Sequence, residues 1–478
     1  MRTWIGTTCF LLLTSLAIAQ DYRKHLYTRP SVPSREVLNR LNLRLNWRTR
    51  IPMRSKRDGI HSCQLAPIYD LKKKKWVMQL LVQTRFGLIV AVDGETGRQI
   101  WRTRVGNPYQ VTEGLGFNFE TVVAIREGFL YGLSRKTGEM LWKIVMKGTP
   151  ATAPILSDEY IYLAVSTRQV AAYLLPSKRV PETKLAWEYS TLYPIESKLL
   201  LSRTQLLVPS VRGALLMLRK DISKLNDRLT TEDVLLAPPG LHPNDGIAYI
   251  GSKDSYVYAR VVEKRIYVPG KPLVTGWRYS AGAPVTRSPV VTDEDVFVTA
   301  DKKGLARVRR NAMNADEMSK YLIDRGLASA SRVAALKKAI LDNARDKTLP
   351  IDPRSILRGL QQQRVLTEDQ IDNINWLGGE PVWRQPKADR VIAVNPKFVY
   401  ATDRRGYLVI LDRRRGTLLT RYNIRNWVFP VTNEYTDRLY LTAHDGLLVS
   451  LHDREYRQPV QMKLPLLPKF LLPKPKKK

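Results

Sequence analysis

The chain has 478 residues, and its 78 Lys and Arg residues exceed its 44 Asp and Glu residues by 34 charges. That excess indicates anionic surroundings but carries no information about the fold. Hydrophobic residues make up 44% of the chain, which is enough for a packed core and excludes a globally disordered protein. The small number of cysteines, 2, excludes a disulfide framework and any site built from several thiolates.

The first twenty residues have the pattern of an export signal. Arg2 precedes an uncharged apolar run over residues 4–16, and Ala17-Ile18-Ala19 follows it. This order predicts a secretory signal peptide over residues 1–19, cleaved after Ala19. The alternative is a membrane anchor, but the run is shorter than the ~20 apolar residues that a span requires. We therefore expect an exported protein of the periplasm or cell envelope, soluble or peripheral to the membrane.

A repeat with a period near forty residues follows. Residues 87–101 align with residues 128–142, and in both segments a Thr-Gly pair stands just before a tryptophan. Residues 406–416 and 445–453 repeat parts of the same pattern. Short β-branched and aromatic runs separated by Gly, Asp or Thr-Gly turns, at this period, predict an all-β propeller with four antiparallel strands per blade. The structural positions of this repeat are Thr96, Gly97, Trp101, Thr137, Gly138, Trp142, Trp187, Trp277 and Trp383.

We expect eight blades. They are centred near residues 80–106, 120–147, 155–189, 196–220, 233–280, 289–384, 391–425 and 431–453. The fourth unit is the least regular, so a seven-bladed ring remains an alternative. The last unit has no outer strand of its own, and the alternating residues 43–48 are expected to supply it, which would remove an open sheet edge.

Residues 311–380 change to a helical period. Met318 and Leu322 are four residues apart, and Thr367 with Gln370 forms a capping box. We expect a small helical bundle inserted in a blade loop, before the strand that ends at Trp383; the alternative is a docking module for another protein. The expected organisation is a signal peptide (1–19), a basic linker (20–42), the propeller (43–310 and 381–458) interrupted by the helical insertion (311–380), and a basic tail rich in proline and lysine (459–478).

Clusters of basic residues are candidates for contact with an anionic lipid or wall polymer. They are Lys72, Lys73, Lys74, Lys75, Arg413, Arg414, Arg415, Lys476, Lys477 and Lys478. A solvated surface is the alternative interpretation of any such run.

The repeat motif resembles the PQQ-type repeat. The resemblance is closest to the BamB family of outer-membrane assembly factors and more distant to the propellers of quinoprotein dehydrogenases. It implies a noncatalytic scaffold that binds envelope proteins and has a role in outer-membrane protein assembly. The chain departs from the BamB family in lacking a lipid-attachment cysteine after the signal, in its strong positive charge and in its inserted helices.

The alternative function is an enzyme or redox protein that uses the propeller channel. Quinoprotein dehydrogenases hold their quinone under a vicinal disulfide, whereas Cys9 and Cys63 are far apart here. His61 and Cys63 are the closest candidate metal ligands, and two ligands do not complete a zinc site. No nucleophile elbow or phosphate loop is present. We therefore expect no catalytic residues, cofactor or metal, and no specific nucleic-acid partner.

Overall fold

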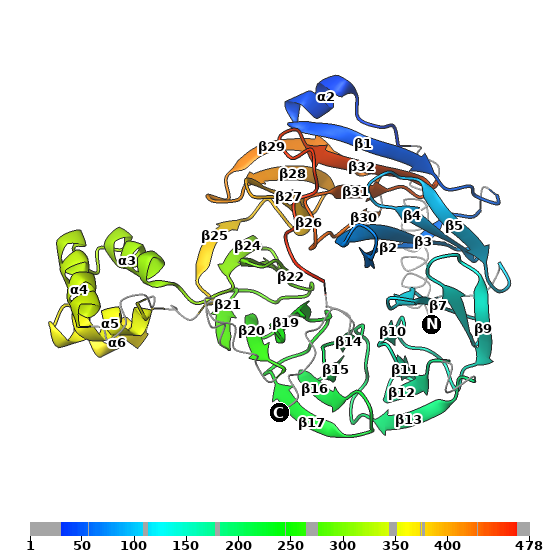
Figure 1. The fold of residues 1–478 in the computed structure, drawn as a ribbon, viewed down its shortest axis with the longest axis horizontal. Coiled ribbons are helices and arrows are strands. Elements are labelled where there is room, and N and C mark those ends of the chain that lie inside the picture. Colours follow the sequence, from blue (N-terminus) through cyan, green and yellow to red (C-terminus); the bar gives the residue numbers. More distant parts are fainter. Residues whose placement is uncertain are drawn as a thin grey trace, which may run out of the picture.

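The computed structural model describes residues 30–55, 57–108, 113–176, 182–243, 245–263, 276–343, 351–372, 374, 378–427 and 429–465. The predicted signal peptide and Lys476, Lys477 and Lys478 lie outside the described residues. The strands form sheets that are arranged radially around a central axis in one closed ring (Figure 1). No helix among the described residues has the length and apolar character needed to cross a membrane.

Within the described residues the strands form eight four-stranded antiparallel sheets, which confirms the predicted eight-bladed propeller. Blade one contains β2 (Ile60–Asp70), β3 (Lys75–Thr84), β4 (Leu88–Asp93) and β5 (Gln99–Arg104), and blade two contains β6 (Gly116–Phe117), β7 (Thr121–Arg126), β8 (Phe129–Ser134) and β9 (Met140–Val145). Blade three contains β10 (Ile155–Leu156), β11 (Tyr160–Val165), β12 (Gln169–Leu174) and β13 (Leu185–Ser190), and blade four contains β14 (Leu200–Leu201), β15 (Gln205–Pro209), β16 (Ala214–Arg219) and β17 (Leu225–Thr230). Blade five contains β18 (Gly240–His242), β19 (Ile247–Gly251), β20 (Tyr256–Val261) and β21 (Trp277–Ser280). Blade six contains β22 (Val290–Val291), β23 (Asp295–Ala300), β24 (Gly304–Arg309) and β25 (Pro381–Gln385), and blade seven contains β26 (Arg390–Val394), β27 (Phe398–Thr402), β28 (Tyr407–Asp412) and β29 (Leu418–Asn423).

The eighth blade is built from both ends of the described chain. It contains β30 (Phe429–Val431), β31 (Leu439–Thr442), β32 (Leu447–Asp453) and, as its outer strand, β1 (Leu43–Arg50). β1 runs antiparallel to β32, from the pair Leu43 and Asp453 to the pair Arg50 and Leu447. The expectation that the N-terminal stretch completes the last blade is therefore confirmed.

Several strands, including β2, β6 and β17, lie outside the units drawn from sequence. The outer strand of blade four, β17, lies outside the expected range 196–220. The sequence did not reveal this strand, because its side chains are almost all exposed and show no apolar pattern. The inner strand of blade one, β2, is 11 residues long and begins well before residue 80. With β17 present, the irregular fourth unit is a complete blade, which decides for eight blades over seven.

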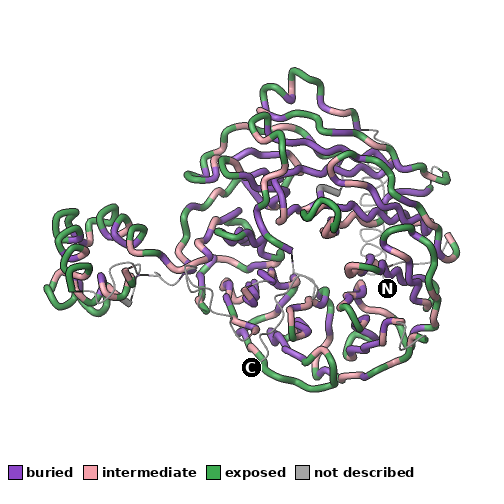
Figure 2. Tube along the Cα trace, viewed as in Figure 1, coloured by how far each residue is buried: buried purple, intermediate pink, exposed green. Residues whose placement is uncertain are grey.

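The core lies between neighbouring blades. β4 and β7 are buried along nearly their whole length, because a middle strand of a blade is covered on both faces (Figure 2). One cluster joins Leu81 and Ile89 of blade one to Val122 and Ala124 of blade two. Burial on both faces explains why these strands are nearly continuous apolar runs, since neither face meets water.

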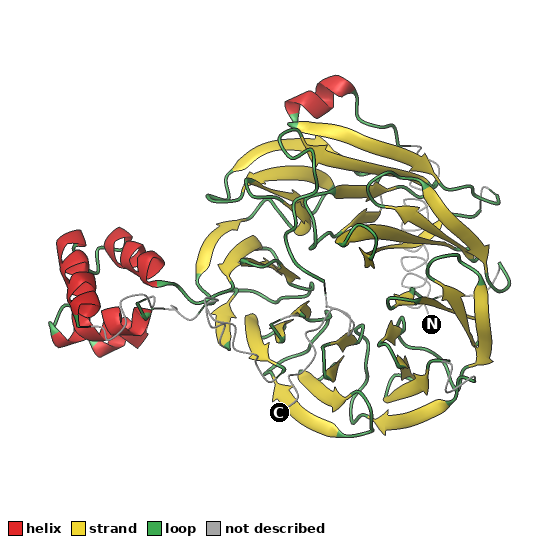
Figure 3. Ribbon diagram, in the orientation of Figure 1, coloured by secondary structure: helices red, strands yellow, loops and turns green. Residues whose placement is uncertain are grey.

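The helical insertion lies between β24 and β25 and stands beside the ring (Figure 3). Its helices are α3 (Ala315–Asp324), α4 (Ala330–Asp342), α5 (Pro353–Gln362) and α6 (Glu368–Asp372), and they surround a separate apolar cluster that includes Met318, Leu336 and Leu360. A further helix, α2 (Arg35–Arg40), precedes β1. The predicted bundle in a blade loop is therefore confirmed.

Candidate binding surfaces

The repeat tryptophans join one blade to the next. Trp101 on the outer strand of blade one donates its indole N–H to the carbonyl oxygen of Arg135 in blade two, at 2.8 Å. Its ring lies against Gly138, where a Cβ atom would come within 2.5 Å of the indole. Gly138 also has a φ of +77°, which favours glycine. The Thr-Gly turn of one blade is thus shaped to receive the tryptophan of the blade before it.

The same contact recurs around the ring. In each case the acceptor is the carbonyl oxygen that follows the third strand of the next blade: Trp47 to Gly94 (2.8 Å), Trp187 to Lys220 (3.3 Å), Trp277 to Arg310 (3.2 Å) and Trp383 to Arg413 (2.8 Å). Thr96 donates to the Asp93 carboxylate within its own turn, and Thr137 to Glu139. Trp142 is half-buried and its ring lies over Gly132 of its own sheet. These interactions give the repeat positions a structural role.

The turns after the first and third strands of each blade define one face of the ring. Strands alternate in direction within a blade, so the turns after the first and third strands of every blade lie on the same side. We call this side the hairpin face. It carries the turn between β2 and β3, the helical insertion between β24 and β25, and the turn between β28 and β29. The predicted basic turns at residues 72–75 and 413–415 therefore share a face, although they are far apart in sequence.

The β2–β3 hairpin projects from this face. The N–H of Gly94, in the turn of the same blade, donates to the carbonyl of Met78 at 2.8 Å, and three residue pairs continue beyond that level, ending at Asp70 and Lys75. At ~3.4 Å per residue the hairpin stands about 10 Å above the turn. Its tip consists of exposed side chains, namely Lys72, Lys73, Lys74 and Lys75.

Arg413 does not belong to the exposed basic surface. Its guanidinium is buried and lies 2.8 Å from the Asp295 carboxylate, which also accepts a hydrogen bond from Arg307. Arg413 therefore joins blade seven to blade six and is not available to an external anion. Arg414 and Arg415, the next two residues, are exposed.

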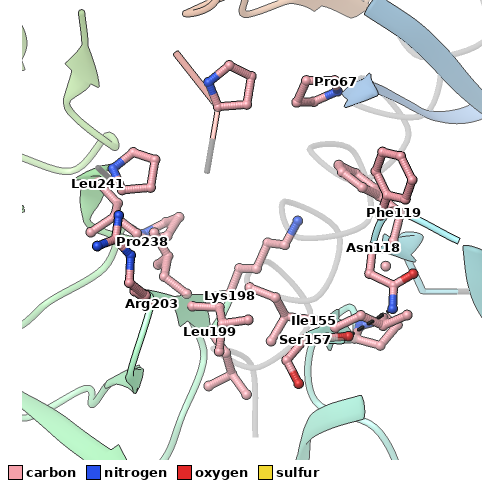
Figure 4. A pocket seen from close by; sticks show the side chains of 18 of the residues that line it. Pro67, Asn118, Phe119, Ile155, Ser157, Lys198, Leu199, Arg203, Pro238 and Leu241 are labelled. Carbon is pink, nitrogen blue, oxygen red and sulfur yellow. Dashed lines mark hydrogen bonds between the residues drawn. The ribbon is translucent and has the colours of Figure 1, made fainter. Parts of the chain in front are cut away.

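A cavity of about 580 Å³ occupies the hub of the ring (Figure 4). Most of its wall is apolar and comes from the inner strands and first turns of several blades, with Phe117, Phe119, Leu199, Leu201, Pro238 and Leu241 among the lining residues. This size lies within the usual range of small-molecule sites, roughly 300–1,000 Å³.

The chain after blade eight crosses this hub. The N–H of Met462 donates to the carbonyl of Tyr435 at 2.8 Å, and the buried Lys463 forms an ion pair with Glu434. Pro465 lies in the cavity wall. The first residues of the segment predicted as a basic tail from residue 459 are therefore held inside the ring.

The charged side chains around the cavity are mainly basic. Five cationic residues and two carboxylates line it: Arg135, Lys198, Arg203, Lys220 and Lys463 against Asp158 and Glu434. Arg135 is buried and donates to the carbonyls of Ala66 and Pro67 and to the Gln79 side chain. Burial lowers the pKa of Arg135 to about 9, so it still carries its charge at neutral pH.

The rim of blade two presents an exposed apolar strand. β9 is the outer strand of its sheet and is paired on one side only, with β8. Met140, Leu141 and Val145 on this strand are 58%, 54% and 73% exposed. Among the described residues, no other outer strand has more than one exposed large apolar side chain. An unpaired edge that is also apolar is a template for a strand of another protein.

The described residues contain no group of three or more His, Cys, Asp or Glu side chains able to hold a metal ion. Cys63 is a free cysteine, and burial raises its pKa to about 12, which keeps it a thiol. His242 is buried between Asp245 and Asp293, at 3.2 and 2.9 Å, and Arg310 pairs with the same Asp245. That cluster joins blade five to blade six.

The closed ring of four-stranded blades, in which outer-strand tryptophans dock on turns of the next blade, makes this protein a PQQ-like β-propeller. Comparison with known proteins agrees. The sequence profile of the family described as "Outer membrane protein assembly factor BamB" matches residues 85–219.

Two relatives carry the same name. The outer membrane protein assembly factor BamB of Burkholderia pseudomallei (strain K96243) is 28% identical over 88 residues, a match that spans 18% of this chain and only 22% of the relative. The crystal structure of BamB from Moraxella catarrhalis superposes with a TM-score of 0.54 at 13% identity, covering 87% of this chain and 99% of that one, which shows a shared fold. The computationally designed protein Ika8 gives a TM-score of 0.49 at 11% identity over 84% of this chain and 98% of the design.

Sequence reasoning did not find the apolar edge of β9 or the hub cavity. The run Met-Leu-Trp-Lys-Ile-Val at residues 140–145 is apolar at every position except Lys143, and this signal distinguishes β9 from the other outer strands. The cavity has no comparable signal, because its lining residues are spread from Pro67 to Pro465.

Proposed function

We propose that this protein is a noncatalytic scaffold of the bacterial cell envelope that binds protein partners and acts in outer-membrane protein assembly. The exposed apolar edge of β9 carries the partner-binding part of the proposal. The similarity to BamB in repeat type and fold supports the assembly role.

A rigid ring with one apolar edge is suited to hold an extended segment of a partner. Leu141, Lys143 and Val145 point to the same side of β9, because side chains two residues apart share a face, and all three are exposed. A partner strand added beside β9 would pair its main chain with the free edge and cover these apolar side chains. The strands of outer-membrane barrels, which alternate apolar and polar residues, have the pattern that such an edge fits.

The hairpin face supports a second contact, with an anionic surface. The four lysines at the tip of the β2–β3 hairpin stand above the ring, and each lysine near an anionic leaflet contributes about 1 kcal/mol at low salt. We propose that this face is turned toward anionic lipid or wall polymer while β9, on the rim, stays open to the partner. In the same proposal, residues 1–19 are removed during export.

Site-specific crosslinking in the native envelope tests the partner site. A photo-crosslinking amino acid replaces Lys143 on β9 or, as a matched control, Arg421 on the outer strand β29. We expect adducts at position 143 with an outer-membrane barrel or a component of its assembly machinery, and not at position 421. Leu141→Lys with Val145→Lys should abolish the adduct, whereas Leu419→Lys on β29 should not.

Equal crosslinking at the two positions would contradict the proposal, and so would adducts at position 143 that contain only proteins unrelated to barrel assembly. Circular dichroism of each variant checks that the ring is intact, so that a lost adduct reports the edge and not unfolding.

A further inference from the structure

We infer that the hub cavity is a binding site for a single-headed amphipathic carboxylate, such as a long-chain fatty acid. This inference is independent of the proposed scaffold role, because the cavity lies at the axis of the ring and β9 lies on its rim. It rests on the combination of an apolar wall and two basic side chains without acidic partners.

The wall selects the apolar part of the ligand. Phenylalanine, leucine, isoleucine and proline side chains from blades two to five form most of the lining, and they give no directional hydrogen bonds. Filling such a space with hydrocarbon removes apolar surface from water, at about 25 cal/mol for each Å². A flexible chain fits a cavity whose lining comes from separate turns better than a flat, polar ring system does.

Lys198 provides the first charge. It lies two residues before β14, and its side chain points toward the middle of the cavity (Figure 4). It has no ion pair or hydrogen bond with the residues that the structure describes. Lys198 is exposed toward the cavity, and the apolar walls around its ammonium group lower its pKa through partial desolvation. A carboxylate would restore the stabilisation that the ammonium group has lost.

Arg203 provides the second charge. It follows β14 at the same distance on the other side, so Leu200 and Leu201 lie between the two basic residues. The Nε atom of Arg203 is buried and has no hydrogen-bond partner among the described residues. A buried donor without an acceptor is unfavourable, and an anionic ligand is the acceptor that fits.

The remaining charges leave room for one anionic head. Lys463 is already paired with Glu434, and Arg135 is held by backbone carbonyls. Lys220, the fifth cationic residue of the wall, is not free either. Asp158 is exposed and lies on the first turn of blade three, where it disfavours a second negative charge on the ligand. Two cations from one blade that have no acidic partner among the described residues, beside a mainly apolar wall, match a monoanion with a hydrocarbon chain.

Isothermal titration of the delipidated full chain tests the inference, with oleate below its micelle concentration as the probe. Methyl oleate, which has the same chain without the charge, is the matched ligand control. We expect micromolar binding of oleate and at least tenfold weaker binding of the ester. Lys198→Met and Arg203→Met should each weaken oleate at least tenfold, because a good charge-assisted contact contributes about that factor.

Lys224→Met is the matched control variant, since Lys224 is an exposed lysine of the same blade outside the cavity. It should bind oleate as the unmodified protein does. Leu241→Trp, which places a larger side chain in the wall, should exclude the ligand. The inference is overturned if oleate does not bind, if the ester binds equally well, or if Leu241→Trp and Lys198→Met leave oleate affinity unchanged. Thermal unfolding of each variant without ligand separates loss of binding from loss of fold.

Discussion

Replacing Trp101 tests whether the tryptophan contacts hold the ring together. The side chain is 5% exposed, its ring packs on Gly138, and its N–H donates to the carbonyl of Arg135 in the next blade. Trp101→Ala should lower the free energy of unfolding by about 3–5 kcal/mol, the range for truncation of a buried large aromatic residue. Trp101→Phe keeps much of the burial but leaves the carbonyl without this donor, so it should cost about 1–3 kcal/mol.

Urea unfolding followed by far-ultraviolet circular dichroism measures these changes, because the signal does not depend on the tryptophan that is removed. Trp142→Ala is the matched control: the same residue at the equivalent position of blade two is half-buried and should cost only about 1–2 kcal/mol. Equal shifts for Trp101→Ala and Trp142→Ala would refute the reasoning, since burial against the next blade is what distinguishes them.

Three further results are expected. Replacing Lys72, Lys73, Lys74 and Lys75 together by Ala should weaken binding to phosphatidylglycerol vesicles by up to about 4 kcal/mol at low salt. At high salt, or with neutral vesicles, the variant and the unmodified protein should bind equally. An unchanged affinity at low salt in sedimentation assays would exclude the hairpin as the contact. Cys63, whose pKa is raised to about 12, should react with a thiol reagent at pH 8 at least a hundredfold more slowly in the folded protein than in urea, and faster as the pH rises toward that pKa; equal rates in both states would show that the thiol is accessible and ionised. Replacing residues 312–377 by a short Gly-Ser linker should leave the propeller folded and change its free energy of unfolding by about 1 kcal/mol or less. The reason is that the insertion has its own core, and that the N–H of Arg309 donates to the carbonyl of Glu380 where β24 meets β25. An unfolded product by circular dichroism would show instead that the insertion supports the ring.

The sequence could predict the propeller because its strongest motif is itself a contact. The tryptophan seen at Trp101 recurs at Trp47, Trp187, Trp277 and Trp383 because each of these outer strands meets the turn of the following blade in the same way. The Thr-Gly pair recurs because a side chain at Gly138 would strike the indole of Trp101. Trp142 keeps the period but packs on its own sheet. β17 lacked that signal, because this outer strand has no tryptophan and its side chains face solvent.

The binding surfaces depend on residues that no local pattern connects. In the run at residues 413–415, only the position of Asp295, 118 residues away, determines that Arg413 turns inward while its two neighbours remain exposed. The same holds for the hub, because Lys198 and Arg203 look like ordinary surface residues until the ring brings Phe119 and Leu241 into the wall of the same cavity.

The pairing of β1 with β32 sets a condition on when this protein can finish folding. Synthesis proceeds from the N-terminus, so Leu43 emerges first and must wait for its partner Asp453, the last residue of the final strand. Until then seven blades can stack but the circle stays open, with the first and the last sheet both uncovered. A chain that stops before residue 453 therefore cannot complete the pairing that closes the eighth blade.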